Sequence, residues 1–198
     1  GSTSAKRNSL SVQSLLQASA RLAMPNYFKL PLWQAKGIAN VVVETPRGAR
    51  VKLNYDEELD CFTMKRPLPA GIAYPYDWGF LPSTRGGDGD PLDVLIMHEE
   101  PTVPGVVVRC RIAGALKVRE TKKDGKRQRN DRFIAVPQED CRARLSSVVD
   151  LTKKLRTDLE EFFRATGGAA GKKLRFLGWA EPKEALQLIK AGEEAFAE

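Results

Sequence analysis

The chain has few of the residues that build structural metal centres or disulfide frameworks. It contains a single histidine, His98, and three cysteines, Cys61, Cys110 and Cys141, with no close pair among them. Zinc sites normally use closely spaced Cys and His ligands, so a structural zinc centre is not expected. The lone histidine also excludes mechanisms that need two. An odd, scattered set of cysteines is typical of a reducing compartment, and this predicts a cytoplasmic protein.

Long hydrophobic runs are also missing. No stretch approaches the roughly 18 apolar residues of a membrane-spanning helix, and residues 1–7 lack the apolar core of a signal peptide. The first two residues, Gly1 and Ser2, are interpreted as a cloning remnant. The 198 residues, 42% of them hydrophobic and 29% charged, suit one folded domain. The net charge of +7 favours a polyanionic partner or a phosphate-containing substrate.

The hydrophobic pattern predicts many short strands followed by two helices. Residues 1–37 are weakly patterned and are assigned to an N-terminal arm, with a single domain over 38–198. Strands are expected at 38–44, 50–55, 62–66, 92–97, 133–136 and 173–179, with two more between 105 and 118. The first two, joined by a short Gly-containing link, are expected to form a β-hairpin.

Helical spacing begins near Val148 and continues to Phe163, and Gly167-Gly168 is expected to end that helix. A closing helix is expected from Ala185 to Phe196. This order of elements predicts an α+β fold with a barrel.

The segment Asp88–Val94 carries the strongest chemical signal. Three carboxylates, Asp88, Asp90 and Asp93, lie within six positions on a loop shaped by Gly89 and Pro91. Carboxylates crowded in this way repel one another unless a cation lies among them, and Mg²⁺ prefers oxygen ligands. A solvated acidic turn is the alternative, because loops favour Asp for turn geometry alone. The apolar strand that follows makes that alternative less suitable for Asp93.

These residues and their neighbours resemble the soluble inorganic pyrophosphatases of the Mg²⁺-dependent, barrel-type class. The resemblance covers roughly residues 38–180, with one insertion. Its motifs are Val41–Pro46, Lys52, Arg66, Tyr74–Phe80, Asp88–Val94, Pro104-Gly105, Arg109–Arg111, Gly114–Lys117, Ile134–Pro137, Phe162-Phe163 and Gly178-Trp179. It implies a five-stranded OB-like β-barrel with flanking α-helices, a homo-oligomer, and hydrolysis of pyrophosphate to two phosphates by a metal-activated water.

The resemblance also implies roles for individual residues. Asp90 is the implied catalytic residue, which positions or deprotonates the attacking water. The implied metal-binding residues are Asp88, Asp93, Glu44, Glu120 and Asp131. The implied substrate-binding residues are Lys52, Arg66, Trp78 and Arg132. The implied cofactor is Mg²⁺.

Several positions depart from the family pattern. Asn54 replaces an acidic residue, Trp78 a tyrosine and Arg132 a lysine. Glu120 and Asn130 stand where the family has two aspartates, with Asp131 as a possible substitute for the second. Thr166-Gly167 replaces a Tyr-Lys pair, and Lys172 or Lys173 could reach back to supply the missing cation.

The segment Lys117–Arg132 is unusually basic and surrounds Asp124-Gly125, which predicts an extended hairpin. Nucleic-acid binding is one hypothesis for it, although the aromatic residues of a single-strand platform are missing. The leading prediction is therefore an inorganic diphosphatase without membrane association. The alternatives are a hydrolase of an organic diphosphate, or a weakly catalytic relative that binds nucleic acid.

Overall fold

A computed structural model describes residues 26–139 and 145–198. Its strands are β1 (Trp33–Ala35), β2 (Ile38–Thr45), β3 (Val51–Asp56), β4 (Cys61–Pro67), β5 (Asp77–Leu81), β6 (Leu92–Ile96), β7 (Val107–Thr121), β8 (Arg127–Arg129), β9 (Arg132–Pro137) and β10 (Lys173–Ala180). Its helices are α2 (Lys153–Ala169) and α3 (Pro182–Ala197), and short 3₁₀ turns cover Tyr27–Lys29 and Val148–Asp150. None of the described helices is long and apolar enough to cross a bilayer.

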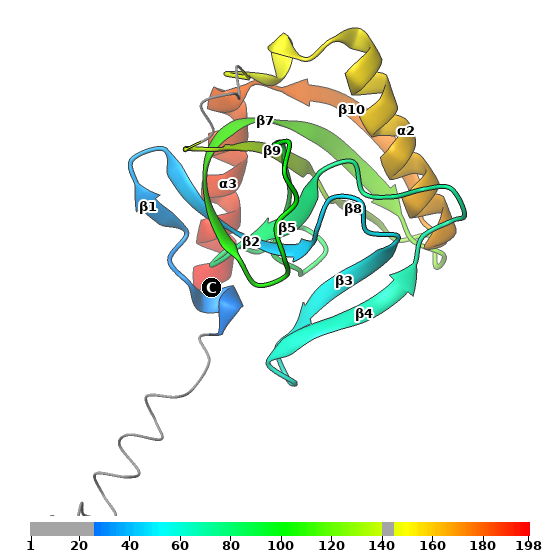
Figure 1. The fold of residues 1–198 in the computed structure, drawn as a ribbon, viewed down its shortest axis with the longest axis horizontal. Helices are drawn as coiled ribbons and strands as arrows, with labels where there is room; N and C mark the ends of the chain where they lie inside the picture. Colours follow the sequence, from blue (N-terminus) through cyan, green and yellow to red (C-terminus); the bar gives the residue numbers. More distant parts are fainter. Residues whose placement is uncertain (1–25, 140–144) are drawn as a thin grey trace, which may run out of the picture.

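Five strands close into a barrel (Figure 1). The ring runs β2–β5–β6–β9–β7, and a second pairing of β7 with β2 completes it. Among the strands of the described residues, only β6 and β9 pair in parallel. Alternate residues of these strands, such as Val41, Val94 and Phe133, fill the interior, and Ile189 of α3 packs on the same core. The predicted α+β fold with a five-stranded OB-like barrel and flanking helices is confirmed.

A single long strand, β7, replaces the two strands predicted between residues 105 and 118. It bulges between Ile112 and Gly114, so its first half pairs with β2 and its second half with β10. Gly114 has φ +146°, and a Cβ there would lie 2.5 Å from the carbonyl oxygen of Ala180. The bulge therefore needs glycine, and it bends one continuous strand around the barrel.

The predicted hairpin between residues 38–44 and 50–55 is wrong. Strand β3 pairs with β4 in a separate two-stranded sheet, which projects from the barrel in Figure 1. Two side chains of β2 replace the missing backbone pairing. Thr45 Oγ1 accepts from Leu53 N at 3.0 Å and donates to Leu53 O at 3.1 Å, and Glu44 Oε1 accepts from Tyr55 N at 2.9 Å. The link 46–50 turns through a hydrogen bond from Ala49 N to Pro46 O at 3.1 Å, and its amide and carbonyl groups also bond to the backbone of Tyr74. As a result, the β3–β4 sheet stands beside the barrel and leaves a cleft.

Helix α2 starts at a Thr152 cap and runs beyond the predicted stop at Gly167-Gly168. Its buried side chains are Leu159, Phe163 and Thr166, which face the barrel. Glycine costs a helix only about 1 kcal/mol, so packing of this face outweighs the local preference.

The part of the predicted arm that is described packs against the domain. Strand β1 pairs with β2, Leu32 is buried, and Phe28 stacks edge-on against Tyr55 at 5.0 Å. Residues 1–25 of the predicted arm, and Cys141, lie outside the described residues.

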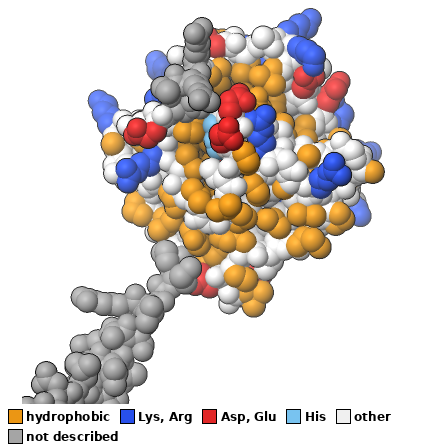
Figure 2. Space-filling view, viewed as in Figure 1, with side chains coloured by type: hydrophobic (Ala, Val, Ile, Leu, Met, Phe, Trp, Pro, Cys, Tyr) orange, Lys and Arg blue, Asp and Glu red, His pale blue; other side chains and the backbone are white. Residues whose placement is uncertain are grey.

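Charged and apolar side chains are mixed on the surface. Figure 2 shows that hydrophobic side chains cover much of one face, with acidic and basic groups among them. The large hydrophobic side chains that are most exposed are Leu59, Met64, Val103, Val106, Val107 and Val149.

Candidate active site

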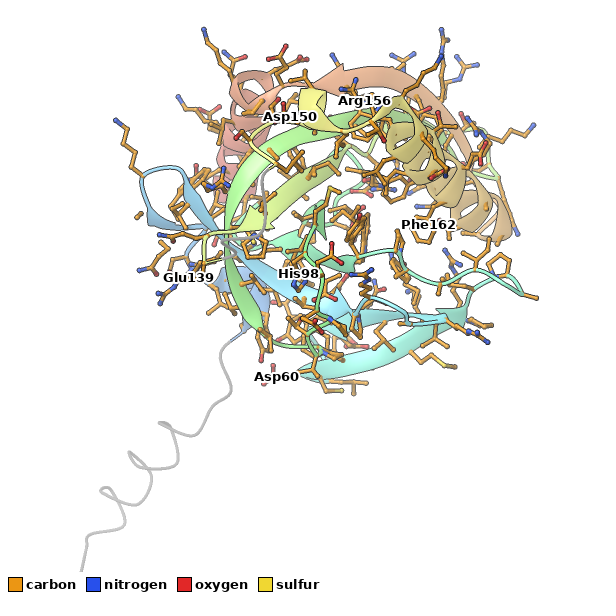
Figure 3. The ribbon with its side chains drawn as sticks, turned by 45° about the horizontal axis from the view of Figure 1, so that its top comes forward. Asp60, His98, Glu139, Asp150, Arg156 and Phe162 are labelled. Carbon is orange, nitrogen blue, oxygen red and sulfur yellow. The ribbon has the colours of Figure 1, made fainter. Side chains whose placement is uncertain are left out.

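A cleft of about 610 Å³ lies between the β3–β4 sheet, one end of the barrel and helix α2. Figure 3 shows one of its lining residues, Phe162, on α2. Eight of the predicted site residues line this cleft: Glu44, Lys52, Arg66, Trp78, Asp88, Asp90, Asp93 and Arg132. They come from β2, β3, β4, β5, β6, β9 and the loop before β6, so the fold brings together side chains that are distant in the sequence.

The acidic side of the cleft is built from the aspartate loop and two strands. Asp88 and Asp90 lie on the loop between β5 and β6, where Asp88 Oδ1 accepts from the amide of Asp90 at 3.3 Å. Asp93 lies on β6, next to the loop. Glu44 reaches the same cleft from β2 and accepts a hydrogen bond from the amide of Tyr55 at 2.9 Å. Four carboxylates thus face one volume.

Burial, with a smaller contribution from crowding, raises the pKa of two of these acids, the direction expected for a cation site. Burial, reinforced by the charges of Asp93 and Asp90, raises the pKa of Asp88 to about 6. Burial also raises the pKa of Glu44 to about 7, although Lys52 opposes the shift. Burial and nearby negative charges both destabilise the ionised form of a carboxylate, and a bound cation stabilises that form. This all-oxygen donor set fits a hard divalent ion such as Mg²⁺.

The opposite side of the cleft is cationic. Lys52 on β3 and Arg66 on β4 are cross-strand partners, so both side chains project from the same sheet face. The Arg66 guanidinium donates to the carbonyl of Thr166 on α2 at 3.0 Å, while its Nη1 is buried without a hydrogen-bond partner among the described residues. The Lys52 ammonium lies 6.0 Å from the centre of the Trp78 ring.

Arg132 joins the two sides. Register pairs it with Asp93 across the parallel strands β9 and β6, and its guanidinium donates to the Asp93 carboxylate. The same group stacks over Trp78 at 5.5 Å and over Phe163 at 5.9 Å. Asn130, which cannot supply a charge, uses its amide to donate to Asp88 and to accept from Arg132.

Unpaired polar atoms gather in this cleft. Asn54 Oδ1, Arg66 Nη1, Trp78 Nε1 and Arg132 Nε are buried without a hydrogen-bond partner among the described residues, and all four residues line the cleft. Buried polar groups are normally paired, so this concentration indicates a site built for a polar ligand.

Two predicted metal ligands lie elsewhere. Asp131 points away from the cleft, where it accepts two bonds from Arg129 and one from the amide of Val118 at 2.8 Å. Glu120 is fully buried behind the cleft wall, and Lys172 Nζ lies 3.0 Å from its carboxylate. Burial alone would raise the pKa of Glu120, but Lys172 and Gln128 lower it below its usual value.

Sequence reasoning missed some lining residues. The family resemblance marks Asn54 only as a departure and gives Asp56 no role, yet both line the cleft with Lys52. The period-2 pattern of β3 was a usable signal, because positions 52, 54 and 56 share one face of a strand. No sequence signal pointed to the hydrogen bonds of Asn130.

Comparison with known proteins agrees with this geometry. The family model described as "Inorganic pyrophosphatase" matches residues 41–197. An inorganic pyrophosphatase of Synechocystis is 34% identical over 163 residues, which cover 82% of this chain and 94% of the relative. An inorganic pyrophosphatase of Thermus thermophilus is 35% identical over 173 residues, which cover 85% of this chain and 96% of the relative.

Solved structures show the same fold. The crystal structure of inorganic pyrophosphatase from Thermus thermophilus aligns with TM-score 0.79 and 32% identity, covering 88% of this chain and all of that one. The crystal structure of an inorganic pyrophosphatase from Neisseria gonorrhoeae aligns with TM-score 0.73 and 30% identity. The alignment covers 82% of this chain and 92% of that one. The family model spans most of the described domain, and the relatives match over almost their whole length. The chain therefore belongs to the inorganic pyrophosphatase family.

Proposed function

We propose that this chain hydrolyses inorganic pyrophosphate to two phosphates in the cleft between the β3–β4 sheet and the barrel. The observation that carries the proposal is the arrangement of four carboxylates opposite Lys52, Arg66 and Arg132 in one cleft. A diphosphate with its divalent cations presents the complementary charges: metal toward the carboxylates and phosphoryl oxygens toward the cations. The family membership supports the same activity.

Asp88, Asp93 and Glu44 are the residues proposed to hold Mg²⁺, with Asp90 beside them. When bound, such ions lower the pKa of water and neutralise phosphoryl charge. Asp93 is also paired with Arg132, so the two groups fix each other's position at the junction of the acidic and cationic sides. We do not include Asp131 in this set, since its carboxylate is held by Arg129 outside the cleft.

Asp90 is the proposed catalytic base. It is exposed at the mouth of the cleft, and its carboxylate makes no ion pair with the described residues. It can therefore accept a proton from an attacking water. Lys52, Arg66 and Arg132 are proposed to bind phosphoryl oxygens, and the Trp78 ring supports Lys52 and Arg132 through its face.

The direct test is phosphate release from pyrophosphate and from a panel of organic diphosphates, with Mg²⁺ and then with Mn²⁺. Pyrophosphate should be the preferred substrate, and chelation of the divalent ion should stop the reaction. Faster hydrolysis of an organic diphosphate than of pyrophosphate would overturn the proposal. No observation in the structure favours the organic substrate.

A homo-oligomer in the cytoplasm is the proposed state of the enzyme. Exposed Val103, Val106 and Val107, close together in sequence before and on β7, support self-association. The cytoplasmic location still depends on the scattered cysteines, of which Cys61 and Cys110 are free thiols in the described residues. Light scattering on the purified chain would establish its mass in solution.

The structure does not favour nucleic-acid binding by the basic segment. The predicted hairpin is confirmed as the β7–β8 pair, but three of its cations are engaged: Lys117 with Glu184, Arg129 with Asp131, and Arg132 with Asp93. If it bound RNA or DNA, affinity would fall steeply with salt, and neutralising Lys122, Lys123, Lys126 and Arg127 would flatten that dependence.

A further inference from the structure

Lys172 stands at the end of the cleft next to α2. Its side chain is 34% exposed and lines the cleft together with Thr166, Gly167 and Ala170, none of which carries a charge. Its ammonium donates to both oxygens of Glu120, at 3.0 and 3.1 Å. An ammonium has three donors, so one remains for a ligand in the cleft.

The end of α2 fixes the backbone of Lys172. Its amide donates to the carbonyl of Gly167 at 2.9 Å, and the amide of Gly171 donates to the carbonyl of Gly168 at 2.8 Å. Together with φ +72° at Gly171, these bonds form a Schellman motif in which Lys172 is the first residue beyond the left-handed turn. The helix end therefore aims the chain back toward the cleft before β10 begins.

Glu120 holds the side chain in place. It is fully buried on β7, and its Oε1 also accepts from Gln128 Nε2 at 2.6 Å. The Arg132 guanidinium lies 3.8 Å from its other oxygen. Asn130 Nδ2 also donates to that oxygen at 3.4 Å. Both oxygens of this carboxylate are thus occupied by protein donors, which does not fit the role of metal ligand that the family resemblance implies.

We infer that Lys172 is a substrate-binding residue that contacts the phosphoryl group at the α2 end of the cleft, and that Glu120 is its positioning residue. This inference rests on the proposed function. It assigns to a loop lysine the cationic role that Thr166 and Gly167 cannot fill. The ligand class is a phosphate monoanion or dianion, either one end of pyrophosphate or the product phosphate.

The test compares Lys172→Met, Lys172→Arg, Glu120→Gln and the double variant Lys172→Met/Glu120→Gln. A matched control is Lys117→Met, which also breaks a lysine–glutamate pair on β7, with Glu184 at 2.7 Å, but lies outside the cleft. We would measure kcat and KM for pyrophosphate, the affinity for inorganic phosphate by calorimetry with and without Mg²⁺, and the melting temperature.

Lys172→Met should weaken phosphate binding and raise KM by about ten- to a hundredfold, because one charge-assisted contact is lost. Lys172→Arg should recover part of the affinity, and Lys117→Met should change neither quantity. Glu120→Gln should weaken binding by a smaller factor, with Mg²⁺ affinity unchanged. The double variant Lys172→Met/Glu120→Gln should bind phosphate as weakly as Lys172→Met alone, because Glu120 acts only through Lys172.

Phosphate affinity that is unchanged in a folded Lys172→Met would overturn the inference. So would a loss of Mg²⁺ affinity in Glu120→Gln, which would return that residue to the metal ligands. If the wild-type chain binds phosphate through Lys172 but does not hydrolyse pyrophosphate, the inference stands and the proposed function fails.

Discussion

Asp93 carries two interactions at the centre of the cleft, one with Arg132 and one with the proposed cation. Its carboxylate accepts from Arg132, and its charge adds to the burial that raises the pKa of both Glu44 and Asp88. Asp90 differs from it in being exposed and unpaired among the described residues. We therefore propose two tasks for the same side-chain type, holding charge at position 93 and exchanging a proton at position 90.

This difference predicts different effects of removing each charge. Asp93→Asn should lower kcat/KM for pyrophosphate by at least about a hundredfold and weaken Mg²⁺ affinity. Asp90→Asn should lower kcat by about 10²–10⁴ with little change in Mg²⁺ affinity. Metal-dependent kinetics and calorimetry of the two variants give the comparison. Full activity in Asp93→Asn would contradict its assignment.

A second residue-scale prediction concerns Asp77, which is fully buried outside the cleft. Burial alone would raise the pKa of Asp77, but hydrogen bonds from His98, Thr102 and the amide of Arg47 lower it overall. His98, labelled in Figure 3, lies 3.0 Å from its carboxylate. Because the folded state depresses this pKa, the stabilisation exists above the unfolded value and is lost as pH falls through the folded one.

Asp77→Asn should therefore lower the free energy of unfolding at pH 7 by about 1–3 kcal/mol, since donors lose a charged acceptor. The variant should lose less stability than wild type as pH falls below the ordinary range of an aspartate. Denaturant unfolding from pH 7 to pH 3 would measure both effects. Parallel curves for the two proteins would show that the Asp77 hydrogen bonds add no pH-dependent stability.

At the scale of elements, the end of α2 shows why a pair of glycines did not stop a helix. Gly167 and Gly168 have ordinary helical φ, whereas Gly171 has φ +72° and forms the stop. A Cβ at Gly168 would meet nothing within 4 Å. A Cβ at Gly167 would lie 3.0 Å from Leu174 Cδ1, so close packing with β10 favours glycine there.

Alanine substitutions at Gly168 and Gly171, one before and one after the helix end, should change the free energy of unfolding in opposite directions. Gly168→Ala should raise stability by about 0.5–1 kcal/mol, because it adds helix propensity in open space. Gly171→Ala should lower stability by about 1–2 kcal/mol, because its φ is left-handed. Thermal unfolding of both variants checks the pair, and a stabilising Gly171→Ala would contradict the Schellman geometry.

At the scale of the whole molecule, the net positive charge includes three arginines that lie together across neighbouring strands. Arg129, Arg119 and Arg175 are direct cross-strand neighbours on β8, β7 and β10, and all three are exposed. Among the described residues only Arg129 of the three has an acidic partner. Like charges directly opposite one another are destabilising by about 0.2–1 kcal/mol.

Arg119→Gln should therefore raise the melting temperature in low salt, with the gain shrinking as ionic strength rises and screens the repulsion. Lys154→Gln is the control, because it removes an attractive pair with Asp158 on α2 and should shift stability the other way. Melting curves from low to high salt would measure both. A gain for Arg119→Gln that does not depend on salt would exclude repulsion as its cause.

The sequence by itself determined the order of elements, the apolar faces and the aspartate loop. These depend on short-range patterns: apolar runs in β2 and β6, alternation in β3, helical spacing in α2, and three carboxylates within one loop. It also indicated the family, and with it eight residues that the structure places in one cleft.

Only the tertiary structure decided which strands pair and which charges meet. The β2–β3 hairpin fails because β2 is needed between β5 and β7, and no local signal encodes that competition. Glu120 and Lys172 are 52 residues apart, yet the pairing of β10 with β7 brings their side chains together. A carboxylate that the family resemblance assigned to a metal thus has a lysine as its partner, because contact depends on the closed barrel and not on distance along the chain.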